Sequence, residues 1–412
     1  MPRNYPVVTI TPKGEKMLVG GHVWVYADEV TEVSSYDGTP ENGSLVDVRS
    51  QKGKYLGTGF YNENSKIRVR VVSKNANDRF DDAFWERKLR WALDYRRTVM
   101  GESDFSCCRL IFGEADAFPG FTVDRFGSVI VTQVLSLGIE RIKDKLYAAL
   151  VRLLREEFGA EISVLYERND VAIRTLEGME QYKGFWQGEG LLTDTDGVTT
   201  ITENGILYEV DYIGGQKTGF FLDQKYNRAA IAKIAKGRKV LDCFTHTGSF
   251  GLNAARGGAS HVTSVDISAD AIAMAKKNAE SNALDGGMDF VCADVFELLT
   301  SMAEKVKGDY DFIILDPPAF TKSRDTLKNA IRGYKEINLK AMKLLPRGGY
   351  LATCSCSHFM TETYFKQMLH NAAEDAGVGL RQIEARQQSP DHPILWNVPE
   401  TDYLKFFIFQ IV

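Results

Sequence analysis

The sequence lacks a long run of apolar residues. None of its 412 residues belongs to a stretch that approaches the ~20 consecutive apolar positions of a membrane-spanning helix. The opening from Met1 to Tyr5 is also not followed by the apolar core of a secretory signal peptide. We therefore expect a protein that does not enter the membrane and that works in the cytoplasm.

Cysteine is scarce, and its spacing suits neither disulfides nor a metal. Of the six cysteines, Cys107 and Cys108 are adjacent, and only one residue separates Cys354 from Cys356, which is too close for a zinc knuckle. The pattern predicts no metal site and favours a reducing compartment. The thiols are therefore available for other chemistry.

An excess of basic charge is also missing, since 50 lysines and arginines face 55 acidic residues. The formal net charge of −5 argues against a chain that coats nucleic acid indiscriminately, although a local basic groove can still bind RNA. The length indicates two or three domains, each large enough for a core of its own.

Short strands and glycine-rich turns dominate the beginning of the chain. Residues 7–73 contain alternating apolar runs, which are separated by apparent turns such as Gly57-Thr-Gly59. We expect an all-β region that closes as a small barrel. The Gly-Gly-His-x-Trp-Val-Tyr pattern from Gly20 to Tyr26 resembles the PUA domain, an RNA-binding pseudo-barrel.

The region that follows combines helices with strands. The apolar periodicity predicts a helix over residues 80–99, in which Trp85 and Leu89 share one face and basic residues such as Arg96 lie on the others. The basic residues could line an RNA channel or simply face solvent. Residues 109–178 then show a strand, a hairpin, a helix and a strand, which indicates a small α+β domain.

The last part has the pattern of a doubly wound α/β sheet. Apolar runs alternate with helical stretches after Gly215, and a hairpin that turns at residues 203–205 precedes them. The final two strands are joined without room for a long helix, which predicts an antiparallel hairpin. We expect seven strands, at residues 239–244, 261–266, 288–292, 311–316, 350–356, 380–385 and 403–412. The predicted domains are a PUA-like β-barrel over 1–75, a linker helix and α+β domain over 76–190, and a hairpin with a Rossmann-like α/β domain over 191–412.

The loop after the first of these strands indicates which nucleotide binds. A dinucleotide site uses G-x-G-x-x-G so that the backbone can approach a pyrophosphate, but Phe244 and His246 put bulk where glycines would be. Asp266 ends the second strand, where a carboxylate can accept hydrogen bonds from both ribose hydroxyls. Asp242, Phe244 and Gly248 resemble the first motif of RNA-modifying methyltransferases that bind S-adenosylmethionine. A turn without a ligand is the alternative.

Two further strand ends carry residues suited to pyrimidine chemistry. Asp316-Pro-Pro318 predicts a rigid turn whose carboxylate can accept a hydrogen bond from the exocyclic amine of cytosine or adenine. Cys356 ends the next strand, where a thiolate could add to C6 of a pyrimidine and so activate C5 for methylation. Both residues could instead be structural, and Cys354 on the same strand face is a competing nucleophile. The thiol would need a lowered pKa, whose source the sequence does not reveal.

Taken in order, the motifs resemble one family over nearly the whole chain. They include the segments Gly215-Gln-Lys-Thr-Gly-Phe-Phe-Leu-Asp-Gln224, Ser264-Val-Asp-Ile-Ser268, Ser355-Cys-Ser357 and Asp391-His-Pro393. With the Asp242 and Asp316 motifs, they are similar to the bacterial 23S ribosomal RNA methyltransferases that make 5-methylcytosine. Two departures are visible, because Ala319 stands where many relatives have lysine and Cys354 adds a second thiol.

The resemblance implies a class I methyltransferase domain that uses S-adenosylmethionine, and roles for individual residues. Cys356 would be the catalytic nucleophile, and Asp316 would contact the edge of the target base. The residues expected to hold the cofactor are Lys217, Thr218, Gly219, Asp242, Phe244, Thr247, Gly248, Asp266, Ile267, Asp294 and Asp316.

The sequence thus predicts a methyltransferase that forms 5-methylcytosine in 23S ribosomal RNA through a covalent adduct with Cys356. One alternative keeps the fold and the cofactor but methylates nitrogen, at guanine N7 or an exocyclic amine. Another is a non-catalytic RNA-binding assembly factor. The target nucleotide, the base that removes the C5 proton and the choice between monomer and homodimer stay open.

Overall fold

The computed structural model describes residues 4–35, 38–305, 309–321 and 323–412. Residues 1–3, where the signal-peptide argument and the predicted first domain begin, lie outside this description. The chain forms two compact units. The first unit contains Met1–Ile201, Val210–Leu222 and Pro390–Thr401, and the second contains Thr202–Glu209, Asp223–Ser389 and Asp402–Val412. Within the described ranges, no helix has the length and apolar character needed to cross a membrane.

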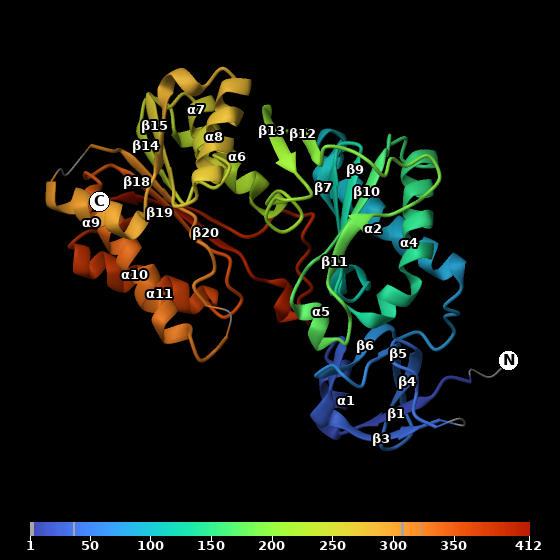
Figure 1. Cartoon of the computed structure of the whole chain (residues 1–412). Helices are drawn as coiled ribbons and strands as arrows, with labels where there is room; N and C mark the ends of the chain where they lie inside the picture. The colour runs from blue at the N-terminus through green and yellow to red at the C-terminus, as the bar shows by residue number, and fades with distance from the viewer. Residues whose placement is uncertain (1–3, 36–37, 306–308, 322) are drawn as a thin grey trace. The chain divides into compact units, whose positions relative to one another are not determined.

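A six-stranded sheet opens the first unit (Figure 1). Its strands are β1 (Val7–Ile10), β2 (Trp24–Tyr26), β3 (Val30–Ser34), β4 (Leu45–Ser50), β5 (Tyr55–Tyr61) and β6 (Ile67–Ser73). They lie in the order β2-β6-β5-β4-β1-β3, and β1 pairs in parallel with β4 but antiparallel with β3. Valines that are completely buried, such as Val25 and Val69, fill the core between the strands and α1.

The prediction that residues 7–73 are all β is wrong at α1 (Pro12–Val19). Thr11 caps this helix through a hydrogen bond from the Gly14 amide to its hydroxyl, and Pro12 occupies the first turn, where no amide is needed. The helix is only eight residues long and buries little besides Leu18. Its apolar residues therefore do not show a recognisable helical periodicity in the sequence. The predicted turn at Gly57-Thr-Gly59 is also wrong, because both glycines lie within β5.

A five-stranded sheet with two long helices completes the first unit. Its strands are β7 (Cys107–Phe112), β8 (Phe121–Phe126), β9 (Val129–Val134), β10 (Val164–Asn169) and β11 (Tyr182–Phe185), in the order β11-β10-β9-β8-β7. The helices are α2 (Asp82–Met100), α3 (Glu102–Phe105), α4 (Leu137–Glu156) and α5 (Ile173–Leu176). The predicted helix over 80–99 and the predicted order of strand, hairpin, helix and strand are confirmed.

A β-hairpin runs across the boundary between the units, as β12 (Val198–Glu203) and β13 (Ile206–Asp211). Its two turn residues both have a positive φ, 53° at Asn204 and 74° at Gly205. Asn-Gly is the pair that tolerates this conformation best, and its twist matches that of the strands. The hairpin predicted at residues 203–205 is confirmed.

The second unit is built on the seven-stranded sheet that the sequence predicts. Its strands are β14 (Lys239–Cys243), β15 (His261–Asp266), β16 (Met288–Cys292), β17 (Phe312–Leu315), β18 (Tyr350–Ser355), β19 (Leu380–Arg386) and β20 (Lys405–Ile411). They lie in the order β16-β15-β14-β17-β18-β20-β19. The first five are parallel, and β20 is antiparallel to both of its neighbours, so the predicted terminal hairpin is confirmed.

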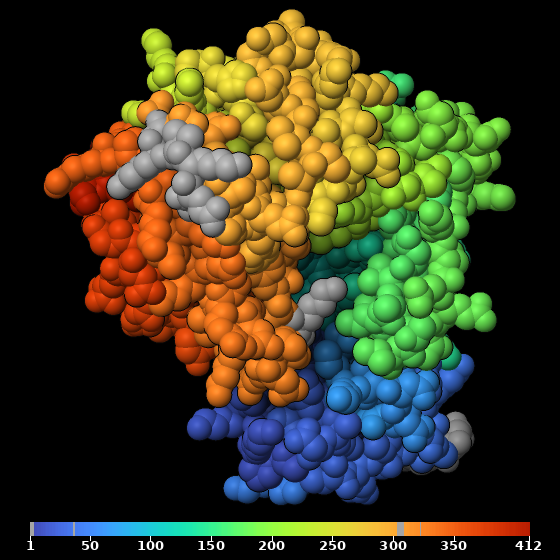
Figure 2. Space-filling model, turned by 60° about the vertical axis from the view of Figure 1, so that its left-hand side comes forward, coloured from blue at the N-terminus to red at the C-terminus, as the bar shows by residue number. Residues whose placement is uncertain are grey.

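Helices cover both faces of this sheet, which explains why its strands read as continuous apolar runs. In Figure 1, α6, α7 and α8 lie on one side and α9, α10 and α11 on the other. These helices are α6 (Lys225–Ile234), α7 (Ser249–Arg256), α8 (Ala269–Ser281), α9 (Val295–Lys305), α10 (Leu327–Leu344) and α11 (Glu362–Ala376). In Figure 2, the atoms of the second unit that face the viewer are coloured mainly yellow to orange-red.

Arg96 corrects one expectation about α2, because its side chain is not on a solvent-facing side but is completely buried in the first unit. Its two terminal nitrogens contact the two carboxylate oxygens of Asp116 at 2.5 and 2.7 Å. It also donates to the carbonyl oxygens of Arg109 and Asp391. The Asp391-His-Pro393 motif is thus tied to α2 and β7, since the Asp391 carboxylate also accepts from the Arg109 amide at 2.8 Å. A buried guanidinium requires such complete pairing.

We expect Arg96→Ala to destabilise the first unit by about 3–5 kcal/mol, because it leaves the Asp116 carboxylate and two carbonyl groups without their partner. Arg97→Ala removes the adjacent, exposed arginine and should cost about 1 kcal/mol or less. Urea denaturation of the two variants measures the difference. Equal stability of the two variants would contradict the structural role of Arg96.

Candidate active site at the carboxyl ends of the strands

Asp242 organises the loop that follows β14. Its carboxylate is completely buried, and one oxygen accepts hydrogen bonds from the Thr245 hydroxyl and from the Gly251 amide at 2.8 Å. Burial raises the pKa of Asp242 to about 7, against the lowering effect of these two bonds. Its other oxygen has no hydrogen-bond partner among the described residues, and neither has the buried hydroxyl of Thr247. The loop therefore contains two buried polar atoms that a ligand could satisfy.

The backbone of this loop has an unusual conformation. Phe244, His246 and Gly248 all have a positive φ, of 63°, 51° and 83°. Such values are uncommon for residues with a side chain and often mark a ligand-binding turn. Gly248 is needed for a second reason, because a side-chain carbon there would lie 3.0 Å from Cβ of Ala275 on α8. The three residues with positive φ turn the chain so that α7 begins at the carboxyl ends of the strands, with its first backbone amides at this edge of the sheet.

Asp266 joins the end of β15 to the same loop. One carboxylate oxygen accepts from the His246 amide at 2.9 Å, and the other accepts from the Ser268 amide at 3.0 Å. Each oxygen keeps a second lone pair, which suits the two hydroxyls of a ribose. The next side chain, Ile267, is 70% exposed, so an apolar surface lies beside this carboxylate.

Asp294 follows the next strand, β16. One of its oxygens caps α9 by accepting from the Phe296 and Glu297 amides at 2.7 and 3.2 Å. Neither bond uses the other oxygen, which can accept from an amine such as that of adenine. Phe296 lies in an aromatic cluster with Phe244, at 6.5 Å between ring centroids. The strand ends thus present acceptors for ribose and amine together with apolar surface, which fits an adenosine group.

Lys217, Thr218 and Gly219 belong to the first unit, and the structure shows what they contact there. Thr218 is buried, and its hydroxyl donates to Asp124 at 2.6 Å. The ammonium of Lys217 lies 4.6 Å from the centre of the Phe221 ring. Gly219 has a φ of 121°, which only glycine adopts easily. Their expected contacts with the cofactor stay predictions.

The side chains of Asp316, which directly follows β17, and Cys354, which lies in the neighbouring strand β18, form a hydrogen bond. The Cys354 thiol, completely buried, donates to one Asp316 oxygen at 3.0 Å, and the Gln224 amide donates to the same oxygen at 3.2 Å. Burial raises the pKa of Asp316 to about 6. Burial also raises the pKa of Cys354 well above that of an ordinary thiol, which favours the protonated form that donates to Asp316. Gln224 was not among the expected site residues, although it ends one of the quoted motifs.

Cys356 lies directly after β18 and is partly exposed, whereas its two neighbours are buried. The Ser355 hydroxyl donates to the Tyr334 hydroxyl at 3.0 Å, and the Ser357 hydroxyl donates to the Thr321 carbonyl at 2.9 Å. These bonds hold the turn on both sides of the thiol. Of the two thiols on this strand, only Cys356 combines a fixed backbone with access to a substrate.

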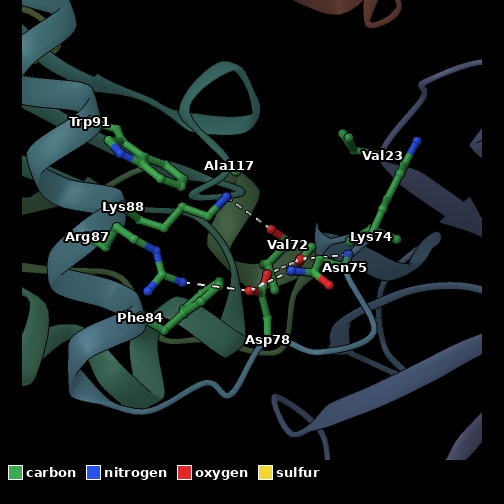
Figure 3. A pocket seen from close by; sticks show the side chains of 12 residues that line it. Val23, Val72, Lys74, Asn75, Asp78, Phe84, Arg87, Lys88, Trp91 and Ala117 are labelled. Carbon is green, nitrogen blue, oxygen red and sulfur yellow. Dashed lines mark hydrogen bonds and ion pairs between the residues drawn. The ribbon is translucent and has the colours of Figure 1, made fainter.

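A hollow of about 720 Å³ in the first unit lies between α2 and the end of β6 (Figure 3). Trp91, which is 58% exposed, lines it together with Arg87 and Lys88, whose charged groups lie 5.6 and 5.8 Å from the centre of the Trp91 ring. Burial lowers the pKa of Lys88. Lys74 adds a further cation from the end of β6. An exposed aromatic ring beside several cations suits a nucleobase and its phosphate.

Comparison with known proteins agrees with this geometry. Residues 174–409 match the family model described as S-adenosylmethionine-dependent methyltransferase, and residues 8–74 match the PUA-like domain. The ribosomal RNA large subunit methyltransferase I of Pseudoalteromonas translucida is 41% identical over 398 residues, which are 96% of this chain and 97% of that protein. Its counterpart in Klebsiella pneumoniae is 37% identical over 409 residues, 99% of each chain.

Solved structures show the same fold. A protein from Streptococcus mutans, described as a candidate S-adenosylmethionine-dependent methyltransferase, superposes with a TM-score of 0.80 at 23% identity, over 98% of this chain and 99% of that one. A second structure with the same scores and coverage is a candidate methyltransferase in complex with SAH. The predicted α/β fold, the PUA-like first region and S-adenosylmethionine as cofactor are thereby confirmed. The chain belongs to the S-adenosylmethionine-dependent methyltransferases, within the family of the ribosomal RNA large subunit methyltransferases I.

Proposed function

We propose that this methyltransferase acts in the cytoplasm on 23S ribosomal RNA and transfers the methyl group to C5 of a cytosine. The observation that carries the proposal is that Asp316 and an accessible thiol, Cys356, directly follow the neighbouring parallel strands β17 and β18. The names of the relatives support large-subunit ribosomal RNA as the substrate. The PUA-like region supports RNA as the binding partner.

The cofactor would be held at the edge formed by β14, β15 and β16. Asp266 would accept from the ribose hydroxyls, Asp294 from the adenine amine, and Ile267 would pack beside the adenine ring. Thr247 and the unpaired oxygen of Asp242 would satisfy further polar atoms. When bound, S-adenosylmethionine supplies an electrophilic methyl group on a sulfonium. The remaining expected cofactor contacts are proposed at Lys217, Thr218, Gly219, Phe244, Gly248 and Asp316.

The protein's own residues would activate the base. The target cytosine leaves its stack, and Asp316 accepts a hydrogen bond from its exocyclic amine. The Cys356 thiolate forms a bond to C6, and the electron pair of the C5–C6 double bond moves to C5, which takes the methyl group. A base in the site or solvent then removes the C5 proton, the double bond forms again, and the thiolate leaves. Cys354 and Gln224 orient Asp316 for this task.

The first unit would hold the RNA near its hollow between α2 and β6. Trp91 can stack on an unpaired base, while Arg87, Lys88 and Lys74 can contact phosphates. The net charge of the chain is negative, so such a local basic surface is needed for RNA to bind.

We expect Cys356→Ala to lower methyl transfer to the RNA by on the order of 10³-fold or more, because no nucleophile remains to activate C5. Cys354→Ala should keep measurable activity, since it removes only a hydrogen bond to Asp316. Transfer of a labelled methyl group to a 23S ribosomal RNA fragment, followed by mass analysis of the nucleosides, measures both. Near wild-type activity of Cys356→Ala would favour methylation at nitrogen instead.

Asp266→Ala should weaken the binding of S-adenosylmethionine by on the order of 10- to 100-fold, since up to two hydrogen bonds to a charged group are lost. Asp289→Ala, which removes an exposed carboxylate of β16, is the control and should bind like the wild type. Isothermal titration calorimetry measures both. Absence of binding to the wild-type protein would favour a non-catalytic assembly factor.

Trp91→Ala should weaken binding of a 23S ribosomal RNA fragment by on the order of 5- to 100-fold, because base stacking on an aromatic ring is worth ~1–3 kcal/mol. Tyr364→Ala removes an exposed aromatic side chain of the second unit and serves as the control. Fluorescence anisotropy measures RNA binding, and calorimetry should show unchanged affinity for S-adenosylmethionine. Unchanged RNA affinity of Trp91→Ala would remove the hollow from the proposed RNA site.

A further inference from the structure

Lys405 is a buried lysine that the chemistry described so far does not use. It begins β20 and lies opposite Ser355 in the antiparallel pair with β18. Its side chain is only about 5% exposed, and its ammonium donates to the carbonyl oxygens of Ser357 and Tyr403 at 2.6 and 2.8 Å. The backbone of Lys405 thus lies opposite Ser355, which precedes Cys356. Its ammonium binds the carbonyl oxygen of Ser357, which follows Cys356.

The burial of this ammonium is not compensated by a carboxylate. Among the residues that the structure describes, no aspartate or glutamate forms an ion pair with Lys405. Its two carbonyl partners are neutral, and they leave one N–H without an acceptor in the part of the chain that the structure describes. A buried cation without an anion is costly, so such a lysine is expected where an anion forms during function.

The charged groups around Lys405 identify that anion. Burial lowers the pKa of Lys405 to about 8, while negative charge on Asp402, Cys356 and Glu362 acts in the opposite direction. Among the described residues, Asp402 and Glu362 form no ion pair with Lys405, whereas Cys356 belongs to the turn whose Ser357 carbonyl oxygen accepts from the ammonium. Further titratable groups near this pair, among the described residues, include His358, which acts on Asp402, and Tyr334 and Cys354, which interact electrostatically with Cys356.

The electrostatic interaction between Lys405 and Cys356 affects the ionisation of both groups. If a thiolate at Cys356 favours the charged form of Lys405, the ammonium favours the thiolate by the same free energy. A free cysteine has a pKa of ~8.5, so at neutral pH only a few per cent of such thiols are ionised. A cation close to the thiol increases the ionised fraction, as it does at other reactive cysteines.

We propose that Lys405 is a positioning residue that clamps the Ser355–Ser357 turn and holds Cys356 in its thiolate form before attack and after release. This inference rests on the proposed role of Cys356 as the nucleophile. Lys405 itself forms no covalent bond and transfers no proton in the cycle.

Alkylation of Cys356 by iodoacetamide tests the inference without requiring methyl transfer. The full-length protein is labelled between pH 5.5 and 9.5, and the modified peptide is quantified by mass spectrometry. We expect the wild-type midpoint to lie below ~8.5, the value of an ordinary thiol. Lys405→Met should raise the midpoint by about one pH unit or more, which slows alkylation at pH 7 by about tenfold. Lys405→Arg should restore most of the effect.

Lys343→Met, which removes an exposed lysine in the last turn of α10, is the control and should leave the profile unchanged. A wild-type midpoint at or above ~8.5 would overturn the inference even if the Lys405 variants fail to fold. So would an unchanged profile in a folded Lys405→Met variant. The proposed function is tested separately, because methyl transfer by Cys356→Ala would contradict it whatever the alkylation profile shows.

Discussion

The site depends on the hydrogen bonds that tie two carboxylates to the backbone of one loop and of the first turn of α7. Asp242 accepts from the Gly251 amide, and Asp266 accepts from the His246 amide, so the ends of β14 and β15 hold the loop between them. These hydrogen bonds offset the free-energy cost of the left-handed backbone conformations of Phe244 and His246, which residues with side chains seldom adopt. Without these bonds, the acceptors for a cofactor would not face one edge of the sheet.

Burial of charge is the second constraint, and it acts in opposite directions on acids and bases. It raises the pKa of Asp242 to about 7 and that of Asp316 to about 6, and it lowers the pKa of Lys405 to about 8. All three groups lie in the second unit. Their pKa values are thereby brought near neutral pH, where small changes in the surroundings alter their charge. The buried guanidinium of Arg96, by contrast, is paired with the Asp116 carboxylate and is therefore structural.

The motifs could be recognised in the sequence because their residues lie at strand ends and turns, where local conformation strongly restricts the residue type. The sequence predicted β15 and β16 with their observed bounds and the hairpin that turns at Asn204-Gly205. It failed where a local pattern was weak or ambiguous. The helix α1 is too short to show its period, and Arg96 reads as a surface residue because its partners lie far away in the chain.

The sequence by itself determined the order of the strands along the chain, the acids that follow them and the presence of two thiols near the end of β18, because these are properties of local pattern and spacing. Only the tertiary structure shows that Cys354 is buried and Cys356 partly exposed, since solvent access depends on which residues pack around each thiol. It also brought Lys405 to the turn that contains Cys356, where its ammonium donates to the Ser357 carbonyl oxygen. Lys405 is 49 residues away from Cys356 in sequence (405 − 356), and only the antiparallel pairing of β18 with β20 places it there.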